Sequence, residues 1–230
     1  MIRSILYPAY FCLFAVIFVT SEAQTNYCSI KCKPNEKQSL CQYPHGYGQR
    51  CNKVIRAGLT SDEKKRLLAK HNELRAFVAS GKEKRGSPGP QPASDNMENM
   101  VWDDEVANLA QAWANQCDYN HDKCRKLPRF SVGQNIALSW SSAQRNVDVV
   151  DFVESWYNEV KDFNRAEVQK FTGENYLNIG HYTQIVWANS KSLGCGLMEY
   201  LSTNNQWNTF LVCDYGPSGN VVGEQVYHIK

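Results

Sequence analysis

The sequence predicts an α+β domain, in which helices come first along the chain and an antiparallel sheet follows. Apolar residues recur at helical spacing in three segments between residues 60 and 160. The last third, from residue 181 to residue 215, is instead rich in β-branched and aromatic residues. Helices followed by a meander of strands are typical of a layered α+β fold rather than a parallel α/β fold.

The first 23 residues have the pattern of a secretory signal peptide. Arg3 precedes an apolar run from Ile5 to Val19, and the small residues Ser21 and Ala23 follow it. We predict cleavage after Ala23 and a secreted, extracellular protein. The alternative is an N-terminal membrane anchor, but the run is short and interrupted. No later stretch has the length of a transmembrane segment.

The cysteine count predicts four disulfides. The chain has nine cysteines, and Cys12 is removed with the signal peptide. An even number of cysteines in an exported chain indicates a disulfide framework, although spacing alone does not determine the pairs. A structural zinc site is the competing interpretation. Cys28 and Cys32 have roughly the spacing of a ligand pair, but no second Cys or His pair follows them at the distance found in zinc fingers. The remaining cysteines are Cys28, Cys32, Cys41, Cys51, Cys117, Cys124, Cys195 and Cys213.

Residues 24–58 are predicted to form a cysteine-rich N-terminal extension. They hold four cysteines together with several proline and glycine residues, and they show little periodicity. Such a segment cannot bury a core of its own. We therefore expect it to wrap onto a main domain at residues 59–230.

Three helices are predicted in the main domain. The first covers residues 60–80, where Thr60 and Glu63 have the spacing of a capping box. The second begins near Asp103, whose carboxylate suits an N-cap, and the third covers residues 147–160. Residues 161–180 are polar with scattered aromatic side chains and are expected to be irregular.

Three strands are predicted in the last third, at residues 181–187, 193–201 and 209–215. The polar run from Ser202 to Gln206 marks a hairpin between the second and the third strand. Cys195 and Cys213 lie in these two strands, so a disulfide between them is the simplest pairing.

The composition excludes some classes of function. The formal net charge of +2 argues against a nucleic-acid-binding protein that depends on bulk charge. The sequence lacks the nucleophile elbow, the dinucleotide-binding glycine motif, the phosphate-binding loop and the His-Glu-x-x-His motif. Paired cysteines also leave no thiol nucleophile. The sequence therefore gives no positive indication of an enzyme.

His121 and His181 are the candidate functional residues. His121 lies just before Cys124, where a disulfide would hold the backbone, and His181 follows a glycine at the start of a predicted strand. Two imidazoles with a carboxylate form a common first shell for zinc or copper. The same groups could instead place an acid, a base and a water for hydrolysis. His71 and His228 are expected to be structural or without a role.

Four segments together resemble a known family. They are His71-Asn-Glu-Leu-Arg75, Gly133-Gln-Asn-Ile136, Gly180-His-Tyr-Thr-Gln-Ile-Val-Trp187 and Leu211-Val-Cys-Asp-Tyr-Gly-Pro-Ser-Gly-Asn220. In this order they resemble the superfamily of cysteine-rich secretory proteins, antigen 5 and pathogenesis-related-1 proteins (CAP, or SCP-like), over residues 59–230. The segment Asn26-Tyr-Cys-Ser-Ile-Lys-Cys32 is most similar to the antigen 5 group of insect venoms and saliva.

The resemblance implies a three-layer α-β-α sandwich with a central antiparallel sheet. It also implies a cleft lined by His121, His181 and Glu159, with Gln134 where the family usually has a second acid. A glutamine cannot accept a proton near neutral pH or give a metal a negative charge. Asp214 is a second departure from the usual residue type. The implied disulfides are Cys28–Cys41, Cys32–Cys124, Cys51–Cys117 and Cys195–Cys213.

The resemblance further implies a secreted, non-enzymatic effector or allergen that meets host proteins or antibodies. One alternative is a lipid carrier that binds a sterol or a fatty acid between the helix faces and residues 161–180. The other is a zinc or copper site at His121 and His181 with weak hydrolase or redox activity. We expect no required cofactor, no nucleic-acid partner, no transmembrane segment and a monomer.

Overall fold

The computed structural model describes residues 25–230, so the predicted signal peptide and its cleavage after Ala23 lie outside the described residues. The helices are α1 (Ser39–Gln42), α2 (Ser61–Ala79), α3 (Asp104–Ala114), α4 (Val149–Tyr157) and α5 (Tyr176–Ile185). Short 3-10 turns cover Tyr27–Ser29, Gln49–Cys51, Asn158–Asp162 and Arg165–Val168. The strands are β1 (Lys53–Ala57), β2 (Val101–Trp102), β3 (Lys126–Leu127), β4 (Phe130–Ser131), β5 (Gly133–Ser141), β6 (Ser192–Leu201) and β7 (Trp207–Gly216).

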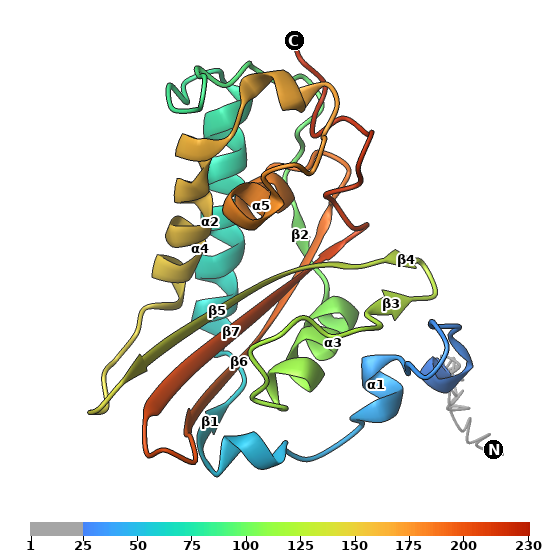
Figure 1. The fold of residues 1–230 in the computed structure, drawn as a ribbon, viewed down its shortest axis with the longest axis vertical. Helices are drawn as coiled ribbons and strands as arrows, with labels where there is room; N and C mark the ends of the chain where they lie inside the picture. The colour runs from blue at the N-terminus through green and yellow to red at the C-terminus, as the bar shows by residue number, and fades with distance from the viewer. Residues whose placement is uncertain (1–24) are drawn as a thin grey trace, which may run out of the picture.

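A five-stranded sheet forms the middle layer of the molecule, with α3 on one face and α2, α4 and α5 on the other (Figure 1). The strands lie in the order β1-β6-β7-β5, and each of these neighbours is antiparallel. β2 adds two residues to β6 in the parallel direction. The α-β-α sandwich with a central antiparallel sheet is therefore confirmed.

The side chains of β6 point alternately to the two faces of the sheet, and the residues that face α3 determine how closely this helix can approach. Leu193 and Leu197 face the layer of α2, α4 and α5, so Gly194 and Gly196 face α3. A Cβ atom on either glycine would overlap the α3 backbone. The two glycines thus let α3 lie directly on the strand.

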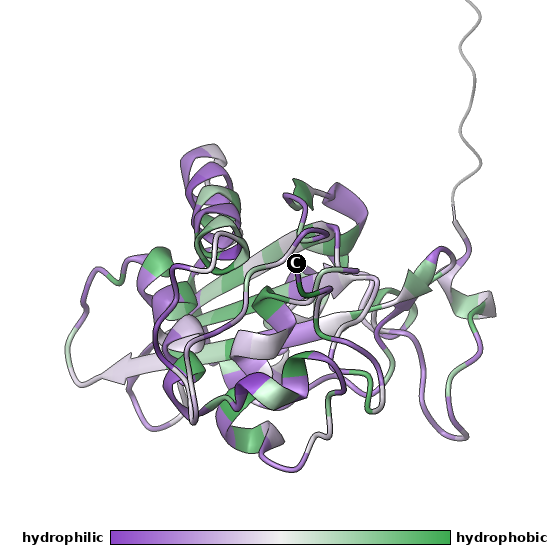
Figure 2. Cartoon of the chain, turned by 90° about the horizontal axis from the view of Figure 1, so that it is seen from above, coloured by the Kyte–Doolittle hydropathy of each residue, from purple (hydrophilic) through white to green (hydrophobic). Residues whose placement is uncertain are grey.

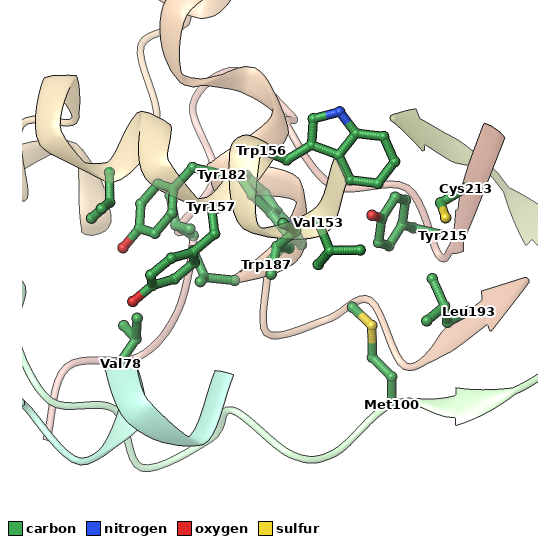
Figure 3. Packing of buried hydrophobic residues seen from close by; sticks show 14 of the residues in the cluster. Val78, Met100, Val153, Trp156, Tyr157, Tyr182, Trp187, Leu193, Cys213 and Tyr215 are labelled. Atoms are coloured by element: carbon green, nitrogen blue, oxygen red, sulfur yellow. The ribbon is translucent and has the colours of Figure 1, made fainter. Parts of the chain in front are cut away.

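The larger core lies between the sheet and the helices α2, α4 and α5. Figure 3 shows the rings of Tyr157 and Tyr182 side by side in this core, and their centroids are 5.5 Å apart. Tyr215 of β7 and Val153 of α4 also belong to this core. Hydrophobic segments alternate with polar ones along the helices and strands (Figure 2), as amphipathic layers require.

The predicted helices are confirmed near their expected ends. α2 begins after Thr60, whose hydroxyl accepts from the Glu63 N–H while the Glu63 carboxylate accepts from the Thr60 N–H. The carboxylate of Asp103 caps α3 by accepting hydrogen bonds from the backbone N–H groups of Glu105 and Val106. The third predicted helix is α4, followed by a 3-10 turn over Asn158–Asp162. No described helix combines the length and the apolar character needed to cross a membrane.

The strand predicted at residues 181–187 is wrong, because this segment belongs largely to α5. The segment is rich in β-branched and aromatic residues, which are typical of strands, and the strand was predicted for that reason. However, Ile179, Tyr182 and Ile185 are fully buried and recur at helical spacing. The helix buries that face in the larger core. α5 also begins at Tyr176, within the segment that was expected to be irregular.

Of the strands in the described residues, β1 to β5 were not predicted, and β5 and β1 are the longest of these. β5 is the edge strand beside β7, and its Ile136 and Leu138 alternate with polar or small neighbours. β1 lies in the segment that was expected to be loop-rich, and it pairs with β6 at the opposite edge of the sheet. The boundary at residue 59 stays a prediction, but the extension contributes a strand to the main sheet.

The disulfides join the same four pairs that the resemblance implies. Cys28–Cys41, Cys32–Cys124 and Cys51–Cys117 involve the N-terminal extension. Cys195 and Cys213 are directly opposite each other on β6 and β7. The extension is thus attached covalently to residues 117–124, which follow α3.

Candidate functional site

His121 lies in the loop between α3 and β3, where the residue reaches solvent although its ring is partly buried against Gln134. Disulfides at Cys117 and Cys124 hold both ends of this loop to the extension. The His121 Nδ1 atom is 2.9 Å from the Gln134 Oε1 atom. The loop is therefore fixed covalently, and the ring is oriented by a residue of β5.

His181 projects from the middle of α5 and is held by Glu159. The His181 Nδ1 atom is 2.6 Å from one carboxylate oxygen of Glu159. The other oxygen accepts from the backbone N–H groups of His181 and Tyr182, at 2.9 and 3.1 Å. The imidazole also stacks on the Trp156 ring, with centroids 5.8 Å apart. Glu159 thus fixes both the ring and the helix backbone.

The two histidines line one small cavity of about 80 Å³. The other residues that line it are Gln134 of β5 and Tyr176, Leu177 and Gly180 of α5. Leu177 is 90% exposed at the rim. Glu159 does not line this cavity, because it lies behind His181 and is hydrogen-bonded to it. Tyr176 and Leu177 were missed by the sequence analysis, since their segment was expected to be irregular.

The hydrogen bonds determine which ring nitrogens can act as acceptors. Glu159 accepts from Nδ1 of His181, and the Gln134 oxygen accepts from Nδ1 of His121. In the neutral rings the hydrogen is then on Nδ1, and the lone pair is on Nε2. Both histidines therefore have the tautomer that suits metal ligation through Nε2, with an oriented second shell.

The described residues contain no group of three or more His, Cys, Asp or Glu side chains arranged to hold a metal ion. The donor set at the cleft is two imidazoles, because the carboxylate beside them, Glu159, is already hydrogen-bonded to Nδ1 of His181 and does not line the cavity. Zinc sites with open positions usually have three protein ligands. The residues thus fit a weak two-histidine site and not a closed structural one.

Gln134 connects the cleft to a buried acidic pair. Its amide nitrogen is 3.0 Å from an oxygen of Asp214 and 3.4 Å from an oxygen of Asp122. Gln134 and Asp214 are opposite each other on β5 and β7, so their side chains share one face of the sheet. The two acceptors fix the amide so that its oxygen faces His121. Gln134 and Asp214, the two residues that depart from the family pattern, therefore form one hydrogen-bonded pair.

Burial and the nearby charges set the ionisation of the groups around the cleft. Burial raises the pKa of Asp214 well above its ordinary value, and the charge of Asp122 raises it further. The removal of water around the ring lowers the pKa of His121, and Arg125 and His181 add to this effect. The cleft thus favours a neutral imidazole at His121 and a neutral carboxyl at Asp214.

The family model of the cysteine-rich secretory protein family, CAP, matches residues 68–215. This range includes β5, α5 and most of the sheet, and therefore the whole cleft. The chain belongs to the CAP family.

Curated CAP relatives cover nearly the whole chain. "Venom allergen 5" of Vespula maculifrons is 49% identical over 207 residues, which is 89% of this chain and 89% of the relative. "Venom allergen 3" of Solenopsis invicta is 46% identical over 211 residues, which is 90% of each chain. The chain is therefore a venom allergen 5-like CAP protein.

Solved structures agree with the fold. "Crystal structure of NaASP2 with Zn2+" matches with a TM-score of 0.63 at 31% identity, and it covers 75% of this chain and 88% of that chain. "Structure of BmVAL-1" matches with a TM-score of 0.65 at 27% identity, and it covers 75% and 84%. The CAP sandwich of this chain thus resembles known structures over three quarters of its length.

A groove lies apart from the cleft, between α2 and α4. Its volume is about 530 Å³. Leu74 and Phe77 of α2 line it together with Tyr157 of α4, and Lys82 and Arg85 lie at one end. No residue of the segment 161–180 lines this groove, so the helix faces alone supply the apolar surface that the sequence analysis suggested.

We expect Gln134→Glu to destabilise the protein by about 3 kcal/mol at about pH 7.5, because it places a third carboxyl beside Asp122 and Asp214. The neighbouring acids raise the folded-state pKa of the new carboxyl. The penalty is therefore complete above that pKa, and it disappears as the pH falls below the unfolded-state value of about 4.3. Urea denaturation across this pH range measures the effect.

Asp214→Asn is the control in the same background, because it replaces the buried acid beside position 134 with an amide that can donate a hydrogen bond to the new carboxyl. The double variant should recover most of the stability that Gln134→Glu loses. A Gln134→Glu variant as stable as the parent near neutral pH would contradict the acidic network.

Proposed function

We propose that the protein is a secreted, non-enzymatic effector that binds host molecules and is recognised by antibodies as an allergen. The observation that carries this proposal is the amide of Gln134, which stands in the cleft where an acid-base mechanism would need a second carboxylate. The names of the venom allergen relatives support the allergen part. The four disulfides suit an extracellular protein.

The acid that lies behind the cleft, Glu159, is poorly suited to catalysis. Both oxygens of Glu159 accept hydrogen bonds, from Nδ1 of His181 and from two backbone N–H groups. A general base must instead reach the proton that it removes from substrate or water. Glu159 is positioned to orient His181, and Gln134 cannot take up a proton.

We expect IgE from people sensitised to Vespula venom to bind the folded recombinant protein, since the chain is 49% identical to a Vespula allergen. A direct binding assay with these sera measures recognition, and sera from people without sensitisation are the control. Absence of IgE binding would remove the allergen part of the proposal.

The non-enzymatic part is tested on the same preparation. Peptide and ester libraries should show equal background turnover for the parent and for His181→Ala. Turnover that is present in the parent and lost in His181→Ala would contradict it.

A second candidate function is binding of a zinc or copper ion at the cleft. The hydrogen bonds that place both Nε2 lone pairs support it, as does the solved relative whose name includes Zn2+. The bound ion would be held by His121 and His181, with Glu159 and Gln134 as the groups that orient the rings. Such an ion would offer an open coordination position to a host ligand.

We expect calorimetry to detect one weak zinc site that is abolished in His121→Ala and in His181→Ala. Glu159→Gln should weaken binding by about tenfold, because it removes the carboxylate that orients His181. His228→Ala is the matched control, since His228 is exposed and pairs with Asp95. Equal zinc binding in the parent and in both cleft variants would exclude this site.

A third candidate function is transport of a lipid in the groove between α2 and α4. Its apolar walls at Leu74 and Phe77 suit an acyl chain, and the cations at Lys82 and Arg85 suit a carboxylate. Arg85 is already paired with Glu83, which leaves Lys82 as the freer cation. This charge favours a fatty acid over a sterol as the ligand.

We expect a fluorescent long-chain fatty acid to bind the parent protein and to bind Ala76→Trp at least about tenfold more weakly, because the indole would fill the groove. Ala69→Trp is the matched control on the exposed surface of the same helix, outside the groove lining. Equal binding by both variants, or no binding by the parent, would reject the lipid site.

A further inference from the structure

A second large cavity lies between the N-terminal extension and the loop after α3. Its volume is about 550 Å³, within the range of small-molecule sites. One wall is formed by residues 35–43 of the extension and the other by residues 113–123. The disulfides Cys32–Cys124 and Cys51–Cys117 join the segments on either side of these walls. The cavity therefore belongs to the covalently fixed part of the molecule.

The lining of this cavity is polar and carries an aromatic pair. Asn35, Gln42 and Asn120 provide carboxamide groups. Tyr43 and Trp113 lie beside them, with ring centroids 6.0 Å apart. Carboxamides can both donate to and accept from hydroxyl groups, and aromatic rings pack against the C–H faces of apolar or amphipathic ligands. This combination suits a ligand rich in hydroxyl groups.

Five exposed lysines lie on the two segments that border the cavity, and two of them line it. The disulfide Cys32–Cys124 brings two short segments together, and each segment carries lysines next to its cysteine. None of these lysines forms a salt bridge with another described residue. The five are Lys31, Lys33, Lys37, Lys123 and Lys126, and Lys37 and Lys123 line the cavity itself. We call this set the lysine rim.

The acids in the cavity wall do not cancel this charge. Asp118 forms a salt bridge with Arg50, and Asp122 forms one with Arg125. Glu36 is the remaining acid in the lining, and it has no salt bridge within residues 25–230. The lysine rim thus carries five formal positive charges against one unpaired negative charge.

We propose that this cavity and its lysine rim bind a sulfated oligosaccharide segment of an extracellular polysaccharide. Sugar hydroxyls would meet the carboxamides and the Tyr43–Trp113 pair, while sulfate groups would meet the lysines. A membrane surface or a nucleic-acid backbone also attracts lysines, but neither needs a carboxamide-lined recess of this size. The site goes beyond the proposed effector and allergen role. It borders the cleft only at His121, which lines both cavities.

The test compares two triple variants with the same change in net charge. Lys33→Gln/Lys37→Gln/Lys123→Gln removes charge from the lysine rim. Lys65→Gln/Lys170→Gln/Lys230→Gln removes it from exposed positions elsewhere, outside both the cavity and the groove between α2 and α4. The probes are a heparin hexasaccharide, the same hexasaccharide after desulfation, and a double-stranded DNA oligonucleotide. Chelator is added so that metal at the cleft does not contribute, and thermal unfolding verifies that both variants are folded.

At about 50 mM salt, we expect the rim variant to bind the heparin hexasaccharide about tenfold more weakly than the parent, and the other triple variant to stay within about twofold. Desulfation should abolish binding, and DNA should bind the parent more weakly than heparin does. Equal losses in the two triple variants, no heparin binding by the parent, or DNA binding as tight as heparin binding would overturn the proposal.

Glu36→Gln provides a gain-of-affinity test that does not depend on loss of function. Removing the unpaired acid should tighten heparin binding by about threefold, because one repulsion from the sulfates disappears. Unchanged or weaker binding in this variant would show that the cavity wall does not meet the sulfated ligand.

Discussion

The buried guanidinium of Arg75 is the interaction on which the arrangement of the helical layer depends. It donates to the carbonyl of Glu98 and to the carbonyls of Ile185 and Trp187, at 2.8 to 3.0 Å. Ile185 is the last residue of α5. The guanidinium of Arg75 on α2 therefore donates to the C-terminal end of α5, where the backbone carbonyls have no partner within the helix. Burial lowers the pKa of Arg75 to about 10, yet the group stays charged at neutral pH. Because α5 carries His181, the position of the cleft depends on this buried contact.

Gln134 and Asp214, which both depart from the family pattern, depend on each other in the structure. The residues are opposite each other in adjacent strands and are joined by a hydrogen bond of 3.0 Å. A glutamate at position 134 would meet a buried acid there, whereas a glutamine donates to it. The amide then turns its oxygen toward His121 and fixes that ring. The glutamine at position 134, in place of a carboxylate, is therefore coupled to the buried acid Asp214.

The sequence could predict elements whose signals are local. The Thr60–Glu63 capping box determines where α2 begins, and the polar run after β6 marks the hairpin to β7. Residues 181–187 were predicted as a strand, because their composition outweighed the helical spacing that burial in the core selects. The contact between Gln134 and Asp214 joins residues 80 apart in sequence. Only the strand register brings such residues together, and local composition does not specify that register.

The N-terminal extension does more than cover the domain. Two of its disulfides hold the segment 117–124, with sequence separations of 66 and 92 residues. Cross-links across such long separations restrict the unfolded chain strongly in the chain-entropy description. They also place His121 in a wall shared by the small cleft and the larger polar cavity. A ligand in either cavity would contact the same short, doubly anchored segment. The extension therefore gives the CAP sandwich a second surface, and the geometry of that surface is linked to the cleft.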